Sequence, residues 1–331
     1  MELISYIILI FLAVITILTE SKLLYKWIFI PATMIFLFIV RYEGFDIDLL
    51  VYAQQMHAKS LDLYYLREFI FWLGSRLVYS LFQNEMLAFL FMDLIWISVI
   101  VKAGNRMSSF NKSNLNNGLL LVLITSFPFV FGFENIYRQF YATIFALFSY
   151  SIIGKNYSRA IFFFIVAFFI HNIVALLIPI LLVKKFYKFN LSDRIQISIL
   201  ISSLLVASLG ILVSLKSSVV TGVEMGVFYL LIFLIMLVVA LIVFKKNIYM
   251  LFEKVPSLLF SAILMIGFIS LDADMIAERI GMMFISFLMF DLYKYSADIE
   301  GRGIRSLVRL FLMLLFTLPT LFFESSLKFL L

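Results

Sequence analysis

Long apolar runs recur from one end of the chain to the other, and they restrict its fold more than any other feature. Residues 3–19 and 226–244 contain no charged side chain and approach the ~20 residues that a helix needs to cross a bilayer. Hydrophobic residues make up 64% of the 331 positions and charged residues only 14%, whereas a soluble domain has about 45–50% apolar and about 25% charged residues. A soluble domain of this length has too little interior to bury so much apolar surface. The sequence therefore predicts an all-α, polytopic membrane protein, and it excludes soluble enzymes and DNA-binding domains.

Ten segments have the length and composition expected of transmembrane helices. They are residues 3–19, 27–41, 86–102, 116–133, 137–153, 195–215, 226–244, 255–271, 276–293 and 306–322. Two further segments are ambiguous. Residues 66–83 carry three charged side chains, and residues 159–183 are divided into two apolar halves at His171 and Asn172.

The distribution of basic residues distinguishes the possible topologies, because cytoplasmic loops carry an excess of Lys and Arg. If residues 66–83 lie at the outer interface and residues 159–183 enter and leave on one side, 18 of the 26 basic residues are cytoplasmic. Other arrangements weaken or invert this bias. We therefore expect about ten spans, both termini outside, a broken or re-entrant hairpin around His171, and an external amphipathic region over residues 42–85. Residues 1–331 are expected to form a single integral membrane domain.

The composition also limits the chemistry. The chain has no Cys and 2 His, so neither a thiolate nucleophile nor a His-rich metal cluster is expected. The sequence has no glycine-rich phosphate loop and no carboxylate-rich metal motif. We therefore predict no metal and no cofactor. We also predict no nucleic-acid partner, since basic residues in a membrane protein report topology.

Several arginines fall at the outer ends of the predicted spans, where ionisable groups are candidates for function. Arg138 begins the fifth span, on the same helix face as Tyr141. It adds its charge to the positive end of the helix dipole, so an anion would stabilise it. The alternative is an arginine that reaches lipid headgroups or pairs with Glu134. Arg279 poses the same question at the start of the ninth span, where Glu278 and Asp274 are the alternative partners, and Arg41 ends the second span.

Three residues are candidates for the transfer of a proton. His171 is the only intramembrane His, and its ordinary pKa of about 6.5 suits a general base or acid near neutrality. The alternative is a structural His at a helix break. Asp46 and Asp48 are rival bases from the external region. Asp93 lies within the third span and is expected to face the interior and to be hydrogen-bonded there.

The order of several motifs resembles that of one family. Residues 137–142 read YRQFYA, a basic turn follows at Lys155 and Arg159, and residues 168–172 read FFIHN. Together they resemble the EpsG-like group of Wzy-type bacterial polysaccharide polymerases, which carry Arg-Gln-x-x-Ala, a basic turn and then Phe-His-x-Ser. The segment from Arg41 through Asp46 or Asp48 to Tyr52 is similar to that family's Arg…Gly-x-Asp…Tyr, and Glu278-Arg279-Ile280 is similar to its late Arg-Ile motif. The family's Ser two residues after the His is Ile173 here.

The resemblance implies a function and a set of site residues. It implies a glycosyltransferase on the outer face of the bacterial inner membrane that joins oligosaccharide units carried on undecaprenyl pyrophosphate. Membrane lipid and a chain-length regulator protein are the other implied partners. The implied site comprises the catalytic candidates His171, Asp46 and Asp48 and the substrate-binding candidates Arg41, Tyr52, Arg138, Gln139, Tyr141 and Arg279. A flippase or transporter of lipid-linked oligosaccharides and an O-antigen ligase are the alternative functions.

Overall fold

Every regular element in the described part of the chain is helical. The structure, a computed structural model, describes residues 1–58, 67–107, 118–185, 274–297 and 299–322, with scattered positions at 190–267, 327 and 330. The elements are α1 (Glu2–Thr19), α2 (Lys22–Leu24), the π-helix η1 (Tyr25–Phe29), α3 (Ile30–Glu43), α4 (Ile47–Met56), α5 (Phe69–Phe82), α6 (Glu85–Met107), α7 (Leu119–Leu123), α8 (Phe127–Glu134), α9 (Tyr137–Ile152), α10 (Tyr157–Ile170), the 3-10 helix η4 (Asn172–Leu177), α11 (Ile178–Lys185), α16 (Asp274–Ser296) and α17 (Arg302–Phe322).

Four helical stretches of the described residues are long and apolar enough to cross a membrane. They are Glu2–Thr19, Lys22–Glu43, Glu85–Asn105 and Arg302–Phe322. They coincide with four of the predicted spans, and their exposed apolar side chains suit a lipid environment. The expected helix over 276–293 is present as α16. The expected spans 195–215, 226–244 and 255–271 lie largely outside the described residues.

The segment predicted as one span over 116–133 is not one continuous helix but two short ones, and its crossing of the membrane stays a prediction. α7 ends at Leu123, and α8 begins at Phe127 with a proline in its first turn. Proline is favoured at that position because it has no N–H to leave unpaired there. Two neighbouring helices stabilise the break. The hydroxyl of Tyr6 in α1 donates to the Thr125 carbonyl at 2.5 Å, and Thr317 in α17 contacts the Thr125 hydroxyl at 2.9 Å.

The two ambiguous segments form short helices. α5 has 14 residues, which at about 1.5 Å per residue is too short to cross a hydrocarbon core of about 30 Å. A place for α5 at the membrane surface remains the expectation. α10 ends at Ile170 and His171 has extended backbone angles, so the predicted break at His171 is confirmed. His and Asn both have low helix propensity, which favours a break at this point.

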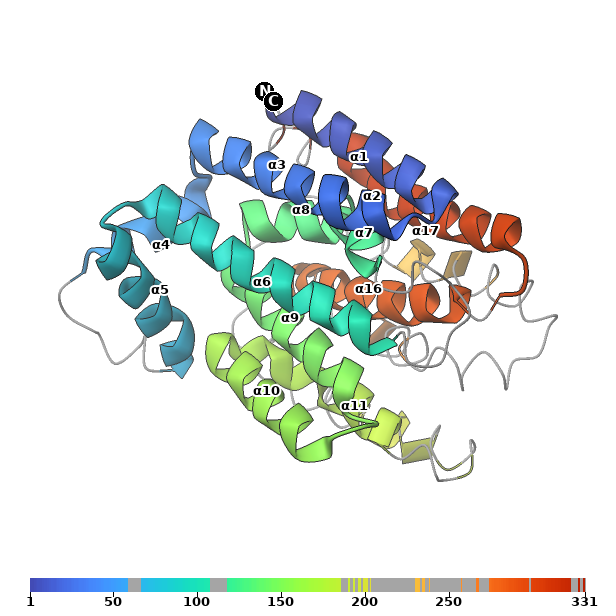
Figure 1. The fold of residues 1–331 in the computed structure, drawn as a ribbon. Coiled ribbons are helices and arrows are strands. Elements are labelled where there is room, and N and C mark those ends of the chain that lie inside the picture. The colour runs from blue at the N-terminus through green and yellow to red at the C-terminus, as the bar shows by residue number, and fades with distance from the viewer. Residues whose placement is uncertain are drawn as a thin grey trace. The chain divides into compact units, whose positions relative to one another are not determined.

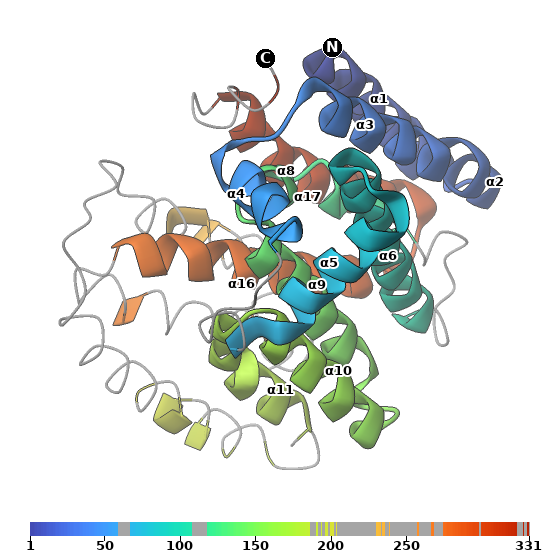
Figure 2. The same ribbon diagram turned by 90° about the vertical axis from the view of Figure 1, so that its left-hand side faces the viewer.

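The contacts divide the chain into two compact units, residues 1–174 with 296–331 and residues 175–295. In the first unit α1 packs on α3 and α17, α6 packs on α3 and α9, and α10 packs on α9 and α5. Figure 1 shows α1 and α17 side by side although they lie at opposite ends of the sequence, and Figure 2 shows the same pair turned by 90°. Almost every side chain of α9 is buried. The candidate residues at its start are therefore held by a rigid central helix.

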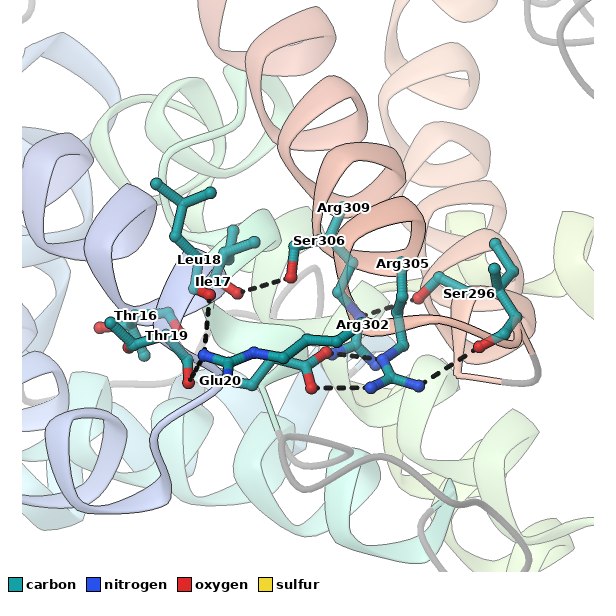
Figure 3. Close-up of polar contacts among 11 residues, drawn as sticks. Thr16, Ile17, Leu18, Thr19, Glu20, Ser296, Arg302, Arg305, Ser306 and Arg309 are labelled. Carbon is teal, nitrogen blue, oxygen red and sulfur yellow. Dashed lines mark hydrogen bonds and ion pairs between the residues drawn. The ribbon is translucent and has the colours of Figure 1, made fainter.

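A cluster of charged residues joins α1 to α17 (Figure 3). Glu20, which follows α1, accepts from Arg305 Nε at 2.6 Å and from Arg305 Nη2 at 2.8 Å, and Arg309 Nη1 lies 3.4 Å from the same carboxylate. Arg302 Nη2 donates to the last carbonyls of α1, at 3.2 Å to Leu18 and 2.6 Å to Thr19. The end of α1 and the start of α17 therefore meet, and the cytoplasmic location of these arginines stays a prediction.

We expect single-cysteine labelling to report the predicted sides of the membrane, because the native chain has no Cys. Gln83→Cys, in the turn after α5, should react with an impermeant reagent added from the predicted outer side of the membrane. Lys155→Cys, in the turn between α9 and α10, should react only after the membrane is opened. Both positions are exposed, so burial would not explain a failure to react. A cysteine that does not react with reagent added from one side therefore faces the other side of the membrane. The reverse pattern would contradict the topology.

Candidate functional site

Arg138 lies in the first turn of α9 and is enclosed by an acid and two aromatic rings. Its Nη1 is paired with the Glu68 carboxylate. The guanidinium carbon lies 4.9 Å from the centroid of Trp72 and 5.2 Å from that of Tyr52, which is cation–π distance. The side chain is 18% exposed, so it reaches the surface while its orientation is fixed. The acid that the structure places against Arg138 is Glu68, whereas the sequence suggested Glu134.

Glu68 is the residue on which this cluster converges. It precedes α5 as its N-terminal flanking residue, and its side chain is 11% exposed. Its Oε2 faces Arg138 and its Oε1 lies 3.3 Å from His171 Nδ1. The carboxylate also accepts the backbone N–H of Asn172. Burial raises the pKa of Glu68 above its usual value, and the charge of Arg138 and the Asn172 hydrogen bond oppose that rise.

His171 is at the end of α10, where the helix gives way to η4. Its backbone N–H donates to the Ala167 carbonyl and closes the helix. Its Nδ1 is 3.3 Å from the Ile173 N–H and 3.3 Å from Glu68 Oε1. The ring is 15% exposed. The structure therefore brings Arg138, from the start of α9, and His171, from the end of α10, to one carboxylate.

Glu68, Tyr52 and Trp72 all belong to the predicted external region 42–85. The resemblance pointed to Tyr52, but sequence reasoning assigned no role to Glu68 or Trp72. A signal for Glu68 was present, since it is an acid beside an apolar segment and such groups are candidates for function. The cluster combines a cation that can bind phosphate, an imidazole that can accept a proton, and aromatic faces.

Arg41 belongs to a second, fully buried group. Its Nε and Nη2 donate to the two oxygens of Asp93 at 2.8 and 3.2 Å, and neither side chain has any exposed surface. Asp93 also accepts from Trp96 at 2.8 Å and from Tyr137 at 2.9 Å. The expectation that Asp93 is interior and hydrogen-bonded is confirmed. In this arrangement Arg41 joins α3 to α6, and its guanidinium presents no surface to a ligand.

The remaining candidates are distributed among other positions. Gln139 and Tyr141 are buried in α9, and the Tyr141 ring packs against Tyr137 and Phe145. Asp46 and Asp48 are half-buried at the start of α4. Arg279 lies near the start of α16, in the second compact unit. The predicted roles of these residues stay predictions.

Comparison with protein families, with curated proteins and with solved structures finds no match for this chain.

The environment of Asp46 predicts how stability depends on pH. Burial raises the pKa of Asp46, and the nearby charge of Arg41 opposes part of that rise. The native state therefore holds this proton to a higher pH than the unfolded state does. The Asp46 contribution to stability is then complete below the unfolded pKa of about 4 and decreases as pH rises through the native value. Thermal unfolding in detergent should show a smaller decrease over this pH range for Asp46→Asn than for the wild type. Equal slopes would contradict the prediction.

Proposed function

We propose that the chain is a polysaccharide polymerase of the outer face of the bacterial inner membrane. It joins oligosaccharide units carried on undecaprenyl pyrophosphate. The growing glycan leaves its pyrophosphate and is transferred to a hydroxyl of the next lipid-linked unit. The observation that carries this proposal is the cluster in which one carboxylate, Glu68, holds both Arg138 and His171.

The chemistry of the cluster fits the needs of this reaction. A bond forms between the acceptor oxygen and the anomeric carbon, and the bond from that carbon to the pyrophosphate oxygen breaks. The leaving pyrophosphate gains negative charge, which a guanidinium stabilises through charge-assisted hydrogen bonds. The acceptor hydroxyl loses its proton as it attacks, and His171 is the proposed base. Arg67, next to Glu68, adds a second cation near the same carboxylate, and this one is exposed.

The surroundings fit a lipid-linked substrate. Four helices of the described residues have the length and composition of membrane spans, and they expose large apolar side chains. Such a surface suits a polyprenyl chain, while the Arg138 cluster suits its charged head. The ring faces of Tyr52 and Trp72 supply apolar contact area beside that head. Arg279 is proposed as a further contact to the pyrophosphate.

Deletion of the gene, followed by separation of surface glycans on a gel, tests the proposal. Loss of a polymerase should collapse the ladder to a single repeat unit on the acceptor, and a plasmid copy should restore the ladder. An O-antigen ligase mutant should carry no repeat unit on the acceptor. A flippase mutant should also lack surface glycan, and it should accumulate lipid-linked units on the cytoplasmic face. Either of the last two patterns would overturn the proposal.

A further inference from the structure

We propose that Glu68 is a positioning residue that sets the tautomer of His171. It holds the proton of the neutral imidazole on Nδ1, so that Nε2 is the basic nitrogen offered to the acceptor hydroxyl. This inference rests on the proposed function for its catalytic meaning, but the tautomer itself is a property of the protein alone. A carboxylate behind an imidazole fixes its tautomer and stabilises the imidazolium that forms when the ring takes a proton.

The contacts of His171 Nδ1 show why a positioning residue is needed. Nδ1 lies 3.3 Å from both the Ile173 N–H and Glu68 Oε1. The Ile173 N–H is a donor, so that contact requires Nδ1 to be unprotonated and places the ring proton on Nε2. The carboxylate is an acceptor, so that contact requires the proton on Nδ1. The two contacts therefore select opposite tautomers, and only the tautomer selected by Glu68 leaves Nε2 able to act as a base.

The charge of Glu68 favours its own tautomer. A hydrogen bond to an ionised acceptor is roughly twice as strong as one between neutral groups. Arg138 on Oε2 and the Asn172 N–H keep this carboxylate in place and counter the effect of burial on its charge. The same carboxylate thus ties the cation proposed to bind phosphate to the proposed base. In the transfer step the hydroxyl proton passes to Nε2, and the resulting imidazolium is stabilised by Glu68.

The substitution Glu68→Gln should reverse the tautomer without changing the size of the side chain. Arg138 has only donors, so it should take the amide oxygen of the glutamine. The amide nitrogen then faces His171, and its N–H should donate to Nδ1. Both neighbours of Nδ1 become donors, so the ring proton moves to Nε2. Nε2 can then no longer accept a proton from the substrate.

Nitrogen-15 NMR measures this tautomer directly, because the chain has 2 His. His57→Gln leaves His171 as the single histidine, and long-range proton–nitrogen correlations distinguish Nδ1 from Nε2. In detergent, at a pH where the ring is neutral, we expect the Nδ1–H tautomer in this background and the Nε2–H tautomer after Glu68→Gln is added. If the His57→Gln protein, in which Glu68 is intact, already shows the Nε2–H form, the inference is overturned. An unchanged spectrum in the double variant would also overturn it.

Polymerisation by the purified protein, supplied with lipid-linked repeat units, tests the consequence. Glu68→Gln should lower kcat about a hundredfold, the usual scale for loss of a general base. Glu85→Gln is the matched control, because Glu85 also pairs with an imidazole, that of His57, outside the cluster. It should retain normal turnover. Absence of polymerisation by the wild type would count against the proposed function, whereas normal turnover by Glu68→Gln in an active preparation would count against this inference.

Discussion

Replacing Arg138 by lysine is expected to lower polymerisation roughly a hundredfold, although the positive charge is kept. Lost interaction with a charged phosphate costs about 3 kcal/mol, which corresponds to this factor in rate. The guanidinium is planar, lies over Tyr52 and Trp72, and pairs with Glu68 through Nη1. A lysine ammonium is a point charge that cannot bind phosphate through two parallel N–H groups or stack in the same way. Turnover of purified variants with lipid-linked repeat units is the measurement.

Arg76→Lys is the control for a general effect of replacing an arginine in the external region. Arg76 lies in α5, and its Nε donates to the Gln55 carbonyl at 3.1 Å. We expect this variant to make chains of normal length. Arg279→Lys is measured in parallel, because Arg279 is the other proposed contact to the pyrophosphate. Normal chain lengths with lysine at both 138 and 279 would exclude bidentate binding by these arginines.

Hydrophobic patterning predicts much of the fold because a helix must bury or immerse its apolar face over its whole length. The spans 3–19, 27–41, 86–102 and 306–322 were therefore accessible from sequence, and so was the break at His171. The interruption between α7 and α8 was missed because residues 118–133 carry no charged side chain and only Thr125 and Ser126 interrupt the apolar run. The local signs were Thr125, Ser126 and Pro128. The break is stabilised by Tyr6 and Thr317, which lie more than a hundred residues away in the sequence.

The candidate site was only partly accessible for a similar reason. Arg138 and His171 could be selected because each is an isolated ionisable group in an apolar setting. Glu68 could not be matched to them, since its contacts depend on how α5 packs against α10. Arg41 shows another dependence on packing, and its predicted role in substrate binding stays a prediction. Its place at the end of a predicted span suggested an exposed ligand contact, whereas the partner that buries it, Asp93, comes from the middle of α6.

The buried pair of Arg41 and Asp93 allows a role in folding to be separated from a role in substrate binding. Asp93→Leu alone should destabilise the protein by about 3 to 5 kcal/mol, because it leaves the arginine charge buried without its partner. The same substitution also removes the acceptor used by Trp96 and Tyr137. Thermal unfolding in detergent, followed by tryptophan fluorescence, should report this loss. Leu81→Ala, at an exposed position in α5, is a control that should leave stability nearly unchanged.

The double variant Arg41→Met with Asp93→Leu then tests the role of Arg41. Replacing both members of a buried ion pair by apolar residues of similar volume is often neutral or stabilising, because no charge remains to be desolvated. We expect the double variant to regain the part of the stability that Asp93→Leu loses through the unpaired arginine charge, while the cost of the lost acceptor for Trp96 and Tyr137 remains. It should polymerise at near wild-type rates, since Arg41 presents no surface to a ligand. A double variant that is stable but inactive would instead place Arg41 among the substrate contacts. That result would mean that the Arg41–Asp93 pair opens during the reaction, and it would restore the assignment suggested by the motif.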